Sequence, residues 1–171
     1  MPEDPQIPMP ESMGDPIDAP TRRRLPPLLR RCWYGLNQAF RRRIAHLSLT
    51  PDQFTVLRSI LEGDPEGMTQ RQVTEAMSSD PNTIASLLER MERAGLLERK
   101  PHEKDRRAHR IIPLEKGIKS YEQAREIAVE LQSEVLEVLP MEQREGFLEQ
   151  LTVIAEACRE AAESSPRRSK T

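Results

Sequence analysis

The chain has 171 residues, of which 32% are charged, and its formal net charge is −2, so bulk charge does not single out an anionic partner. This length suits one compact domain with tails. The sequence contains neither an apolar run of membrane-spanning length nor a signal-peptide pattern, which predicts a cytoplasmic protein. Its two cysteines, Cys32 and Cys158, form no metal-ligand spacing and no disulfide framework, as is typical of a reducing compartment.

The N-terminal part divides into a tail and a first helix. Residues 1–21 are acidic and rich in proline, and we expect them to be disordered. A helix is expected over about residues 26–46, where leucines and other apolar residues recur near the helical period. The surrounding segment, residues 21–51, contains eight arginines and no acidic residue. This part of the chain therefore predicts a basic surface.

Two later helices begin with the same capping signal. Thr50 and Thr69 are each followed three residues later by a glutamine, which is the spacing of a capping box. The helix after Thr69 is short and ends at a pair of serines, and Asp80 can cap a further helix that extends to Gly95. Two helices joined by so tight a turn predict a helix-turn-helix.

A charged hairpin follows this pair of helices. Residues 96–100 and 110–114 predict two strands, and residues 101–109 predict the polar segment between them. Pro113 cannot donate to a strand ladder, so it should lie at an edge or at the end of its strand. Residues 99–110 contain six basic residues against two acidic ones. A basic hairpin in this place predicts a wing, and the expected fold class is mainly α, with a winged helix-turn-helix.

The C-terminal part predicts two long amphipathic helices over about residues 116–163, followed by a disordered basic tail at residues 164–171. Residues 118–163 carry eleven glutamates against four basic residues. Charge is therefore segregated along the chain, and a protein of small net charge can still present one basic face.

The helix after Asp80 carries polar residues that suit contacts with DNA bases. Those expected on its outer face are Asn82, Thr83, Ser86 and Arg90. Asparagine can pair with adenine through two hydrogen bonds, serine and threonine can donate to or accept from several bases, and the N-terminal end of such a helix reaches base edges in the major groove. Thr69 and Gln70, at the start of the preceding helix, are candidate phosphate contacts. The alternative interpretation is that these residues only solvate a surface helix.

Four short segments resemble signature segments of the MarR family of transcriptional regulators: LTPDQF at 49–54, AGLLER at 94–99, DRRA at 105–108 and EKG at 115–117. They occur in the family's order, and the resemblance extends over about residues 26–163. It implies a winged helix-turn-helix that binds a pseudo-palindromic operator in double-stranded DNA as a homodimer. It further implies a repressor that a ligand releases from DNA.

The resemblance also assigns roles in the wing. In the family, one wing arginine enters the minor groove and the aspartate orients an arginine through a salt bridge. Carried over, Asp105 holds the wing while Arg106 or Arg107 enters the groove, where negative potential favours a guanidinium. Two positions depart from the family pattern. Ser86 stands where many relatives have an arginine, so base preference cannot be transferred, and Leu114 stands where a threonine usually caps the next helix.

The domain organisation follows from the same resemblance. Members of the family dimerise through their first helix and last two helices, which here are about residues 26–46 and 116–163. The DNA-binding lobe would be residues 50–114, within a single domain at 22–163. The basic first segment can lie against the acidic C-terminal helices, or its arginines can face DNA, and the sequence leaves both possibilities open.

Effector and redox sites are further implications of the resemblance. Many members bind small aromatic acids or phenols in a cleft between the dimer helices and the DNA-binding lobe. Trp33 and Tyr34 are candidates to line it, although ordinary packing in the core or an interface is the simpler interpretation. Some members sense peroxide through a cysteine, and Cys32 lies beside arginines that favour a thiolate, although its helical register predicts burial.

Other classes of protein are less consistent with the sequence. We find no nucleophile–base pair, phosphate loop or metal-ligand set, so neither an enzyme nor a cofactor or metal site is expected. A winged-helix module that binds proteins without binding DNA is an alternative class. Binding to DNA that weakens steeply as salt rises distinguishes the regulator from that module.

Overall fold

The computed structural model describes residues 19–20, 22–101 and 109–165. Over these residues the chain forms six α-helices, one short 3-10 helix and a three-stranded antiparallel sheet, which confirms the mainly helical fold. No helix in the described part is apolar enough over a sufficient length to cross a membrane. The elements in chain order are α1 (Leu25–Arg43), η1 (Ala45–Leu47), α2 (Pro51–Glu62), β1 (Met68–Thr69), α3 (Gln70–Ala76), α4 (Pro81–Arg93), β2 (Leu97–Pro101), β3 (His109–Pro113), α5 (Glu115–Leu136) and α6 (Met141–Ser164).

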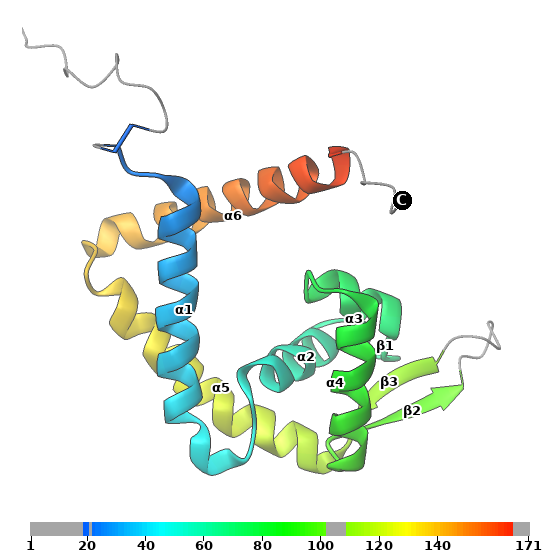
Figure 1. Cartoon of the computed structure of the whole chain (residues 1–171). Helices are drawn as coiled ribbons and strands as arrows, with labels where there is room; N and C mark the ends of the chain where they lie inside the picture. The colour runs from blue at the N-terminus through cyan, green and yellow to red at the C-terminus, as the bar shows by residue number, and fades with distance from the viewer. Residues whose placement is uncertain (1–18, 21, 102–108, 166–171) are drawn as a thin grey trace, which may run out of the picture.

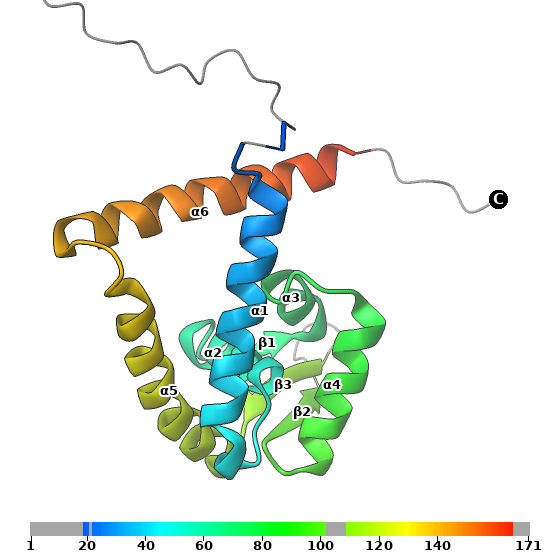
Figure 2. The ribbon, with the colours of Figure 1, turned by 60° about the vertical axis from the view of Figure 1, so that its left-hand side comes forward.

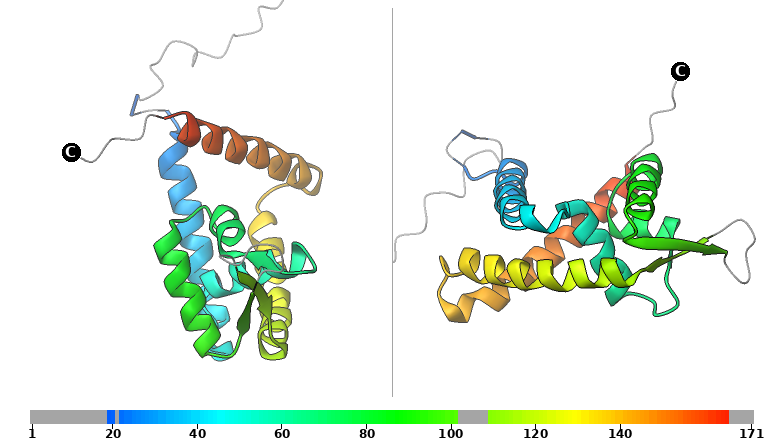
Figure 3. Two further views of the ribbon diagram at one scale, coloured as in Figure 1. Left: turned by 90° about the vertical axis from the view of Figure 1, so that its right-hand side faces the viewer. Right: turned by 90° about the horizontal axis from the view of Figure 1, so that it is seen from below.

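The helices form two groups. Helix α1 runs beside α5, and the group of α2, α3, α4 and the sheet packs against them from one side (Figure 1). The corner between α5 and α6 lies on the opposite side of α1 from α4 (Figure 2). Strands β2 and β3 project outward from the group that contains α4 (Figure 3).

Both predicted capping boxes are present. The Thr50 hydroxyl accepts from the Gln53 backbone N–H at 3.2 Å, and the Gln53 side-chain oxygen accepts from the Thr50 N–H at 2.9 Å. Thr69 and Gln72 make the same exchange at the start of α3. Each box satisfies two backbone donors that have no partner inside the helix, so the starts of α2 and α3 are determined locally.

One hydrophobic core joins the two groups of helices. Its fully buried members come from the residue after α1, from α2, α3 and α4, and from the sheet, and they include Ile44, Leu57, Leu88, Met91 and Ile111. Phe54 of α2 packs edge-on against Phe40 of α1 and stacks on Tyr121 of α5, with ring centroids 4.9 and 5.5 Å apart. This core holds α4 by its inner face and leaves its outer face free.

The sheet contains a strand that the sequence did not reveal. Its order is β1-β3-β2, so β3 is the central strand and the two residues of β1 cover its outer edge. The hairpin strands are Leu97–Pro101 and His109–Pro113, each displaced by one residue from the prediction. Pro113 ends its strand, as expected, opposite Leu97.

The end of α4 and the start of α5 are joined through two backbone carbonyl groups. The Leu96 oxygen accepts from the Leu114 backbone N–H at 3.0 Å, and Lys116 Nζ donates to the Ala94 oxygen at 2.7 Å. A Cβ on Gly117 would lie only 2.0 Å from the Leu96 oxygen. Leu114 gives α5 no side-chain cap, as its residue type predicts. The helix is therefore held at this end by its contact with the turn after α4.

Replacing Gly117 by alanine tests this junction. The new methyl group would collide with a backbone oxygen, so we expect the free energy of unfolding to fall by about 3 kcal/mol. The matched control is Gly146→Ala in α6, where no atom lies within 4 Å of an added Cβ. There the better helix former should stabilise the protein by up to about 1 kcal/mol. Denaturant unfolding measures both variants, and a Gly117→Ala protein of wild-type stability would contradict the geometry.

Candidate nucleic-acid interface

Helix α4 presents a polar face outward because its apolar face is buried. Ile84, Leu87, Leu88 and Met91 are buried at spacings of three and four residues, against α3 and β2. The side chains predicted to reach bases, Asn82, Thr83, Ser86 and Arg90, are all exposed. Figure 1 shows α4 at the edge of its group, with β2 and β3 projecting beyond it.

The start of α4 is fixed by Asp80. One carboxylate oxygen accepts from the backbone N–H groups of Asn82 and Thr83 at 3.1 and 2.9 Å, and the other accepts from the Thr83 hydroxyl. The Thr83 hydroxyl and then its backbone N–H hold the pKa of Asp80 below its ordinary value, because both stabilise the charged carboxylate. The hydroxyl that was predicted to contact a base therefore already donates to the cap.

The two predicted phosphate contacts on α3 also have partners inside the protein. The Thr69 hydroxyl donates to the Gln72 side-chain oxygen at 2.9 Å, in addition to its capping contact. The Gln70 amide nitrogen lies 3.5 Å from the Pro81 oxygen, which connects α3 to α4. The next residue, Arg71, has an 89% exposed side chain that pairs with Glu75 at 3.0 Å. Arg71 is an exposed cation that the sequence does not single out, because an arginine four residues before a glutamate resembles an ordinary surface pair.

The wing is described only in its two strands. The tip, including Asp105, Arg106 and Arg107, lies outside the described residues, so the roles predicted for those three stay predictions. On the strands, the side chains of Arg99 and Arg110 are 28% and 16% exposed, and both are paired with glutamates. The number of basic residues in 99–110 therefore overstates the charge that the wing presents to solvent.

The candidate effector and redox residues lie on an exposed part of α1. Trp33 and Tyr34 are 65% and 60% exposed, so neither belongs to the core of the chain. The prediction that Cys32 is buried is wrong, because the first half of α1 has no buried residue and the thiol is exposed. Cys158 on α6 is exposed as well. The ligand and redox roles of these side chains stay predictions.

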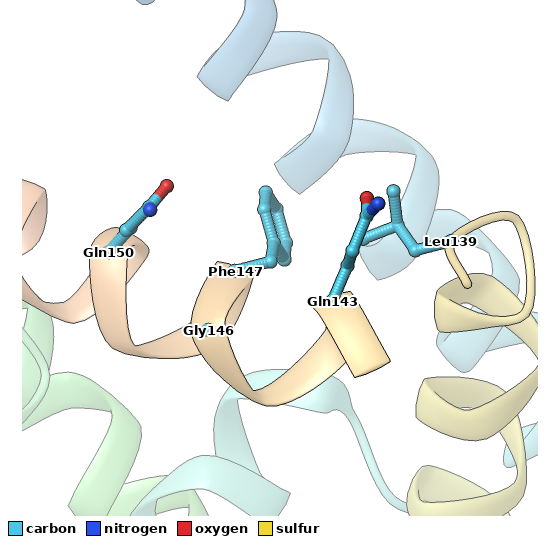
Figure 4. Close-up of a pocket in the computed structure, with 5 residues that line it drawn as sticks. All are labelled: Leu139, Gln143, Gly146, Phe147 and Gln150. Carbon is cyan, nitrogen blue, oxygen red and sulfur yellow. The ribbon is translucent and has the colours of Figure 1, made fainter. Parts of the chain in front are cut away.

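The terminal helices expose a large apolar surface. None of the residues of α6 is buried, and α1 buries only Phe40. A hollow of about 370 Å³ lies along α6, where Phe147 stands between Gln143 and Gln150 with Leu139 at one end (Figure 4). We give the name terminal-helix surface to the exposed apolar residues of α1, α5, α6 and the turn between α5 and α6: Leu25, Leu28, Trp33, Tyr34, Leu36, Val129, Val135, Val138, Met141, Phe147 and Val153.

The arrangement of α2 to α4 followed by the β2–β3 hairpin defines a winged helix-turn-helix protein. Residues 47–108 match the model of the MarR family. The chain is 32% identical over 82 residues to HTH-type transcriptional regulator BilQ of Clostridium symbiosum, and the match covers 48% of this chain and 57% of that regulator. Over α2 to α4 and strand β2 the chain is therefore similar to MarR-family transcriptional regulators, which are not enzymes.

Solved structures agree with this fold. The structure resembles the MepR–DNA complex of Staphylococcus aureus with a TM-score of 0.73 and 23% identity, over 80% of this chain and 99% of that one. It also resembles the MOSR–DNA complex of Mycobacterium tuberculosis with a TM-score of 0.62 and 27% identity, over 77% and 96% of the two chains.

The acid stability of the α4 cap is testable. A depressed pKa in the folded state means that ionised Asp80 stabilises the fold; this contribution is complete above the unfolded pKa of about 3.9. It is lost as the pH falls through the folded pKa. Thr83→Val keeps the shape but removes the hydroxyl donor, so the Asp80 pKa should rise toward its ordinary value. A carboxyl NMR titration measures this, with Thr55→Val on α2 as a control; an unchanged midpoint in Thr83→Val would contradict the assignment.

Proposed function

We propose that the protein is a dimeric transcriptional regulator that binds specific double-stranded DNA, with α4 in the major groove. The observation that carries the proposal is the outer face of α4. Its first turns expose Asn82 and Ser86, whose side chains make no hydrogen bond within the described part of the chain, and β2 and β3 project beyond α4 (Figure 1). Small polar side chains at this end of a recognition helix suit hydrogen bonds to base edges.

The terminal-helix surface supports a homodimer. Eleven large apolar side chains are exposed on α1, α5, α6 and the turn between α5 and α6, and exposed apolar residues that gather on a surface mark interaction sites. A second copy of the chain is the occupant that we propose, because two copies of α4 would then read two half-sites about one helical turn apart. The dimerisation helices would be those near residues 26–46 and 116–163, with residues 50–114 as the DNA-binding lobe.

Charge is consistent with the same assembly. Arg43 at the end of α1 pairs with Glu134 of α5 at 2.6 Å within one chain. Basic α1 and acidic α5 thus already attract each other at one point, and the remaining arginines of α1 are available to a partner.

We further propose that Arg106 or Arg107 enters the minor groove with Asp105 beside it, and that Trp33 and Tyr34 line an effector site. Because its proposed target is DNA, we place the protein in the cytoplasm. We propose that it acts there as a repressor.

The experiment that tests the proposed function is selection of bound sequences from a random pool of double-stranded DNA. A dimer of this kind should recover an inverted repeat with half-sites about 10 base pairs apart. The affinity for the recovered site should fall steeply as salt rises, because phosphate contacts release counterions. Recovery of no preferred sequence, together with salt-insensitive binding, would remove DNA reading as the function.

Substitutions on α4 should alter which sequence is bound. Asn82→Ala and Ser86→Ala remove groups that face base edges, and each substitution should cost about 1–3 kcal/mol at the base pair that its side chain reads. Arg71→Ala is the matched control: we propose that this exposed arginine binds a phosphate, so its removal should weaken binding to all sequences alike and lower the salt slope by about one unit per subunit. Competition between the operator and random DNA measures the difference. Equal reductions in affinity for both DNAs in the α4 variants would show that α4 binds only phosphates.

A charge on the terminal-helix surface should dissociate the dimer. Sedimentation at micromolar concentration should give the wild-type protein about twice its chain mass of 19.6 kDa. Phe147→Glu places a charge in the hollow on α6, where its burial against a partner costs several kcal/mol, and should give monomers. Phe147→Leu, which keeps an apolar side chain, should remain dimeric. A wild-type protein that sediments as one chain would contradict the assembly.

A further inference from the structure

The wing carries one arginine whose side chain is nearly enclosed. The Arg110 side chain on β3 is 16% exposed, whereas that of Lys100, opposite it on β2, is 56% exposed. We propose that Arg110 is a positioning residue: together with Glu66 it fixes the wing against the start of α3, and it does not contact DNA. This proposal rests on the proposed function, because it concerns how the wing is directed at DNA.

The partner of Arg110 belongs to a closed turn between α2 and β1. The Asp64 backbone oxygen accepts from the Gly67 N–H at 2.8 Å, and the Asp64 carboxylate accepts from the Glu66 N–H at 2.9 Å. Pro65 occupies the position in which its fixed φ favours such a turn. Gly67 has a φ of 92°, and a Cβ there would lie 2.8 Å from the Ile111 oxygen. The turn is therefore pressed against β3, and it presents the Glu66 carboxylate from a defined place.

Arg110 holds this turn at three points. Its Nη2 lies 2.8 Å from Glu66 Oε2, and its Nη1 lies 3.4 and 3.3 Å from the backbone oxygens of Glu66 and Gly67. A planar guanidinium can bind a carboxylate and backbone carbonyls at the same time, which a lysine ammonium does less well. The ion pair and the two carbonyl contacts together fix the turn to β3.

The neighbours of Arg110 explain why this contact directs the wing. Arg110 pairs across the ladder with Thr69, which caps α3, and α3 packs on α4. On the other strand, Arg99 Nε lies 3.4 Å from Glu92 Oε2 of α4. The central strand is thus attached to α3 and the outer strand to α4. A guanidinium held in this way is not available to a phosphate.

Substitution of Glu66 gives opposite results if Arg110 positions the wing and if charge alone determines the affinity for DNA. Glu66→Gln removes a negative charge from the DNA-binding lobe, so simple attraction to phosphate predicts tighter binding, the more so if Arg110 is freed to bind DNA. The positioning role predicts weaker binding to the operator, by about threefold to tenfold. Glu75→Gln on α3 is the matched control, because it removes the same charge from another exposed ion pair. It should bind the operator at least as tightly as the wild-type protein.

The salt dependence separates a positioning role from direct binding of phosphate. Arg110→Ala and Arg110→Lys should both weaken operator binding while leaving the slope of log affinity against log salt within about half a unit of the wild-type value. Removing a phosphate-binding cation from each subunit of a dimer would lower the slope by about two units. Arg71→Ala, which removes one exposed cation from each subunit, provides that comparison. A comparable decrease of the slope in Arg110→Ala, or undiminished operator affinity in Glu66→Gln, would overturn the proposal.

Amide hydrogen exchange tests, without DNA, whether the Arg110–Glu66 contact holds the wing in place. In the full chain, Glu66→Gln should speed exchange in the β1–β3 ladder by at least about threefold, because the turn no longer holds the strand pair closed. Glu75→Gln should not change it. If the wild-type protein bound no DNA, the proposed function would fail, but this measurement would still test whether Arg110 and Glu66 hold the wing in place. Unchanged exchange in Glu66→Gln would overturn the positioning role.

Discussion

The backbone oxygen of Leu96 lies where three parts of the molecule meet. Helix α4 ends three residues before it, β2 begins at the next residue, and α5 approaches so closely that only a glycine fits at position 117. Because the contact is made by backbone atoms and leaves no room for adjustment, the direction of α4 is coupled to that of α5 through a few residues. The proposed dimer helices and the proposed reading helix are therefore connected through this contact. A ligand that changes how two copies pack would also change the spacing of the two α4 helices.

The elements that could be predicted from sequence are those whose cause lies within about four residues. The capping boxes of Thr50 and Thr69 and the Asp80 cap each depend on neighbours along the chain, and so does the positive φ of 70° at Gly95. Strand β1 could not be predicted in this way. Its two residues pair with β3 more than forty positions later, at Met68 with Ile111, and no local pattern marks them. The sequence therefore predicts a two-stranded hairpin, whereas the structure adds β1 to it as a third strand.

The candidate site shows the same difference between features with local causes and features that depend on distant residues. The outer face of α4 could be predicted because the apolar residues that define its inner face recur at helical spacing. The partners of individual polar groups could not. The Thr83 hydroxyl donates to Asp80, and Thr69 is occupied by its own cap. The exposure of Cys32 could not be predicted either, because helical register tells which face of a helix a residue shares but not whether another element covers that face. In this chain nothing described covers it.

In the proposed regulator, arginine has two different uses, and burial separates them. Arg99 and Arg110 add to the basic residues of the wing, yet their glutamate partners neutralise them and their side chains are largely enclosed. Arg71 carries the same formal charge, but its side chain is 89% exposed. Exposed surface pairs contribute little and exchange readily, so Arg71 can give up Glu75 for a phosphate at small cost, whereas Arg110 would have to abandon three contacts. A regulator with a net charge of −2 would then depend on a few exposed cations near α4 to bind DNA. Its enclosed arginines would determine the direction in which those cations point.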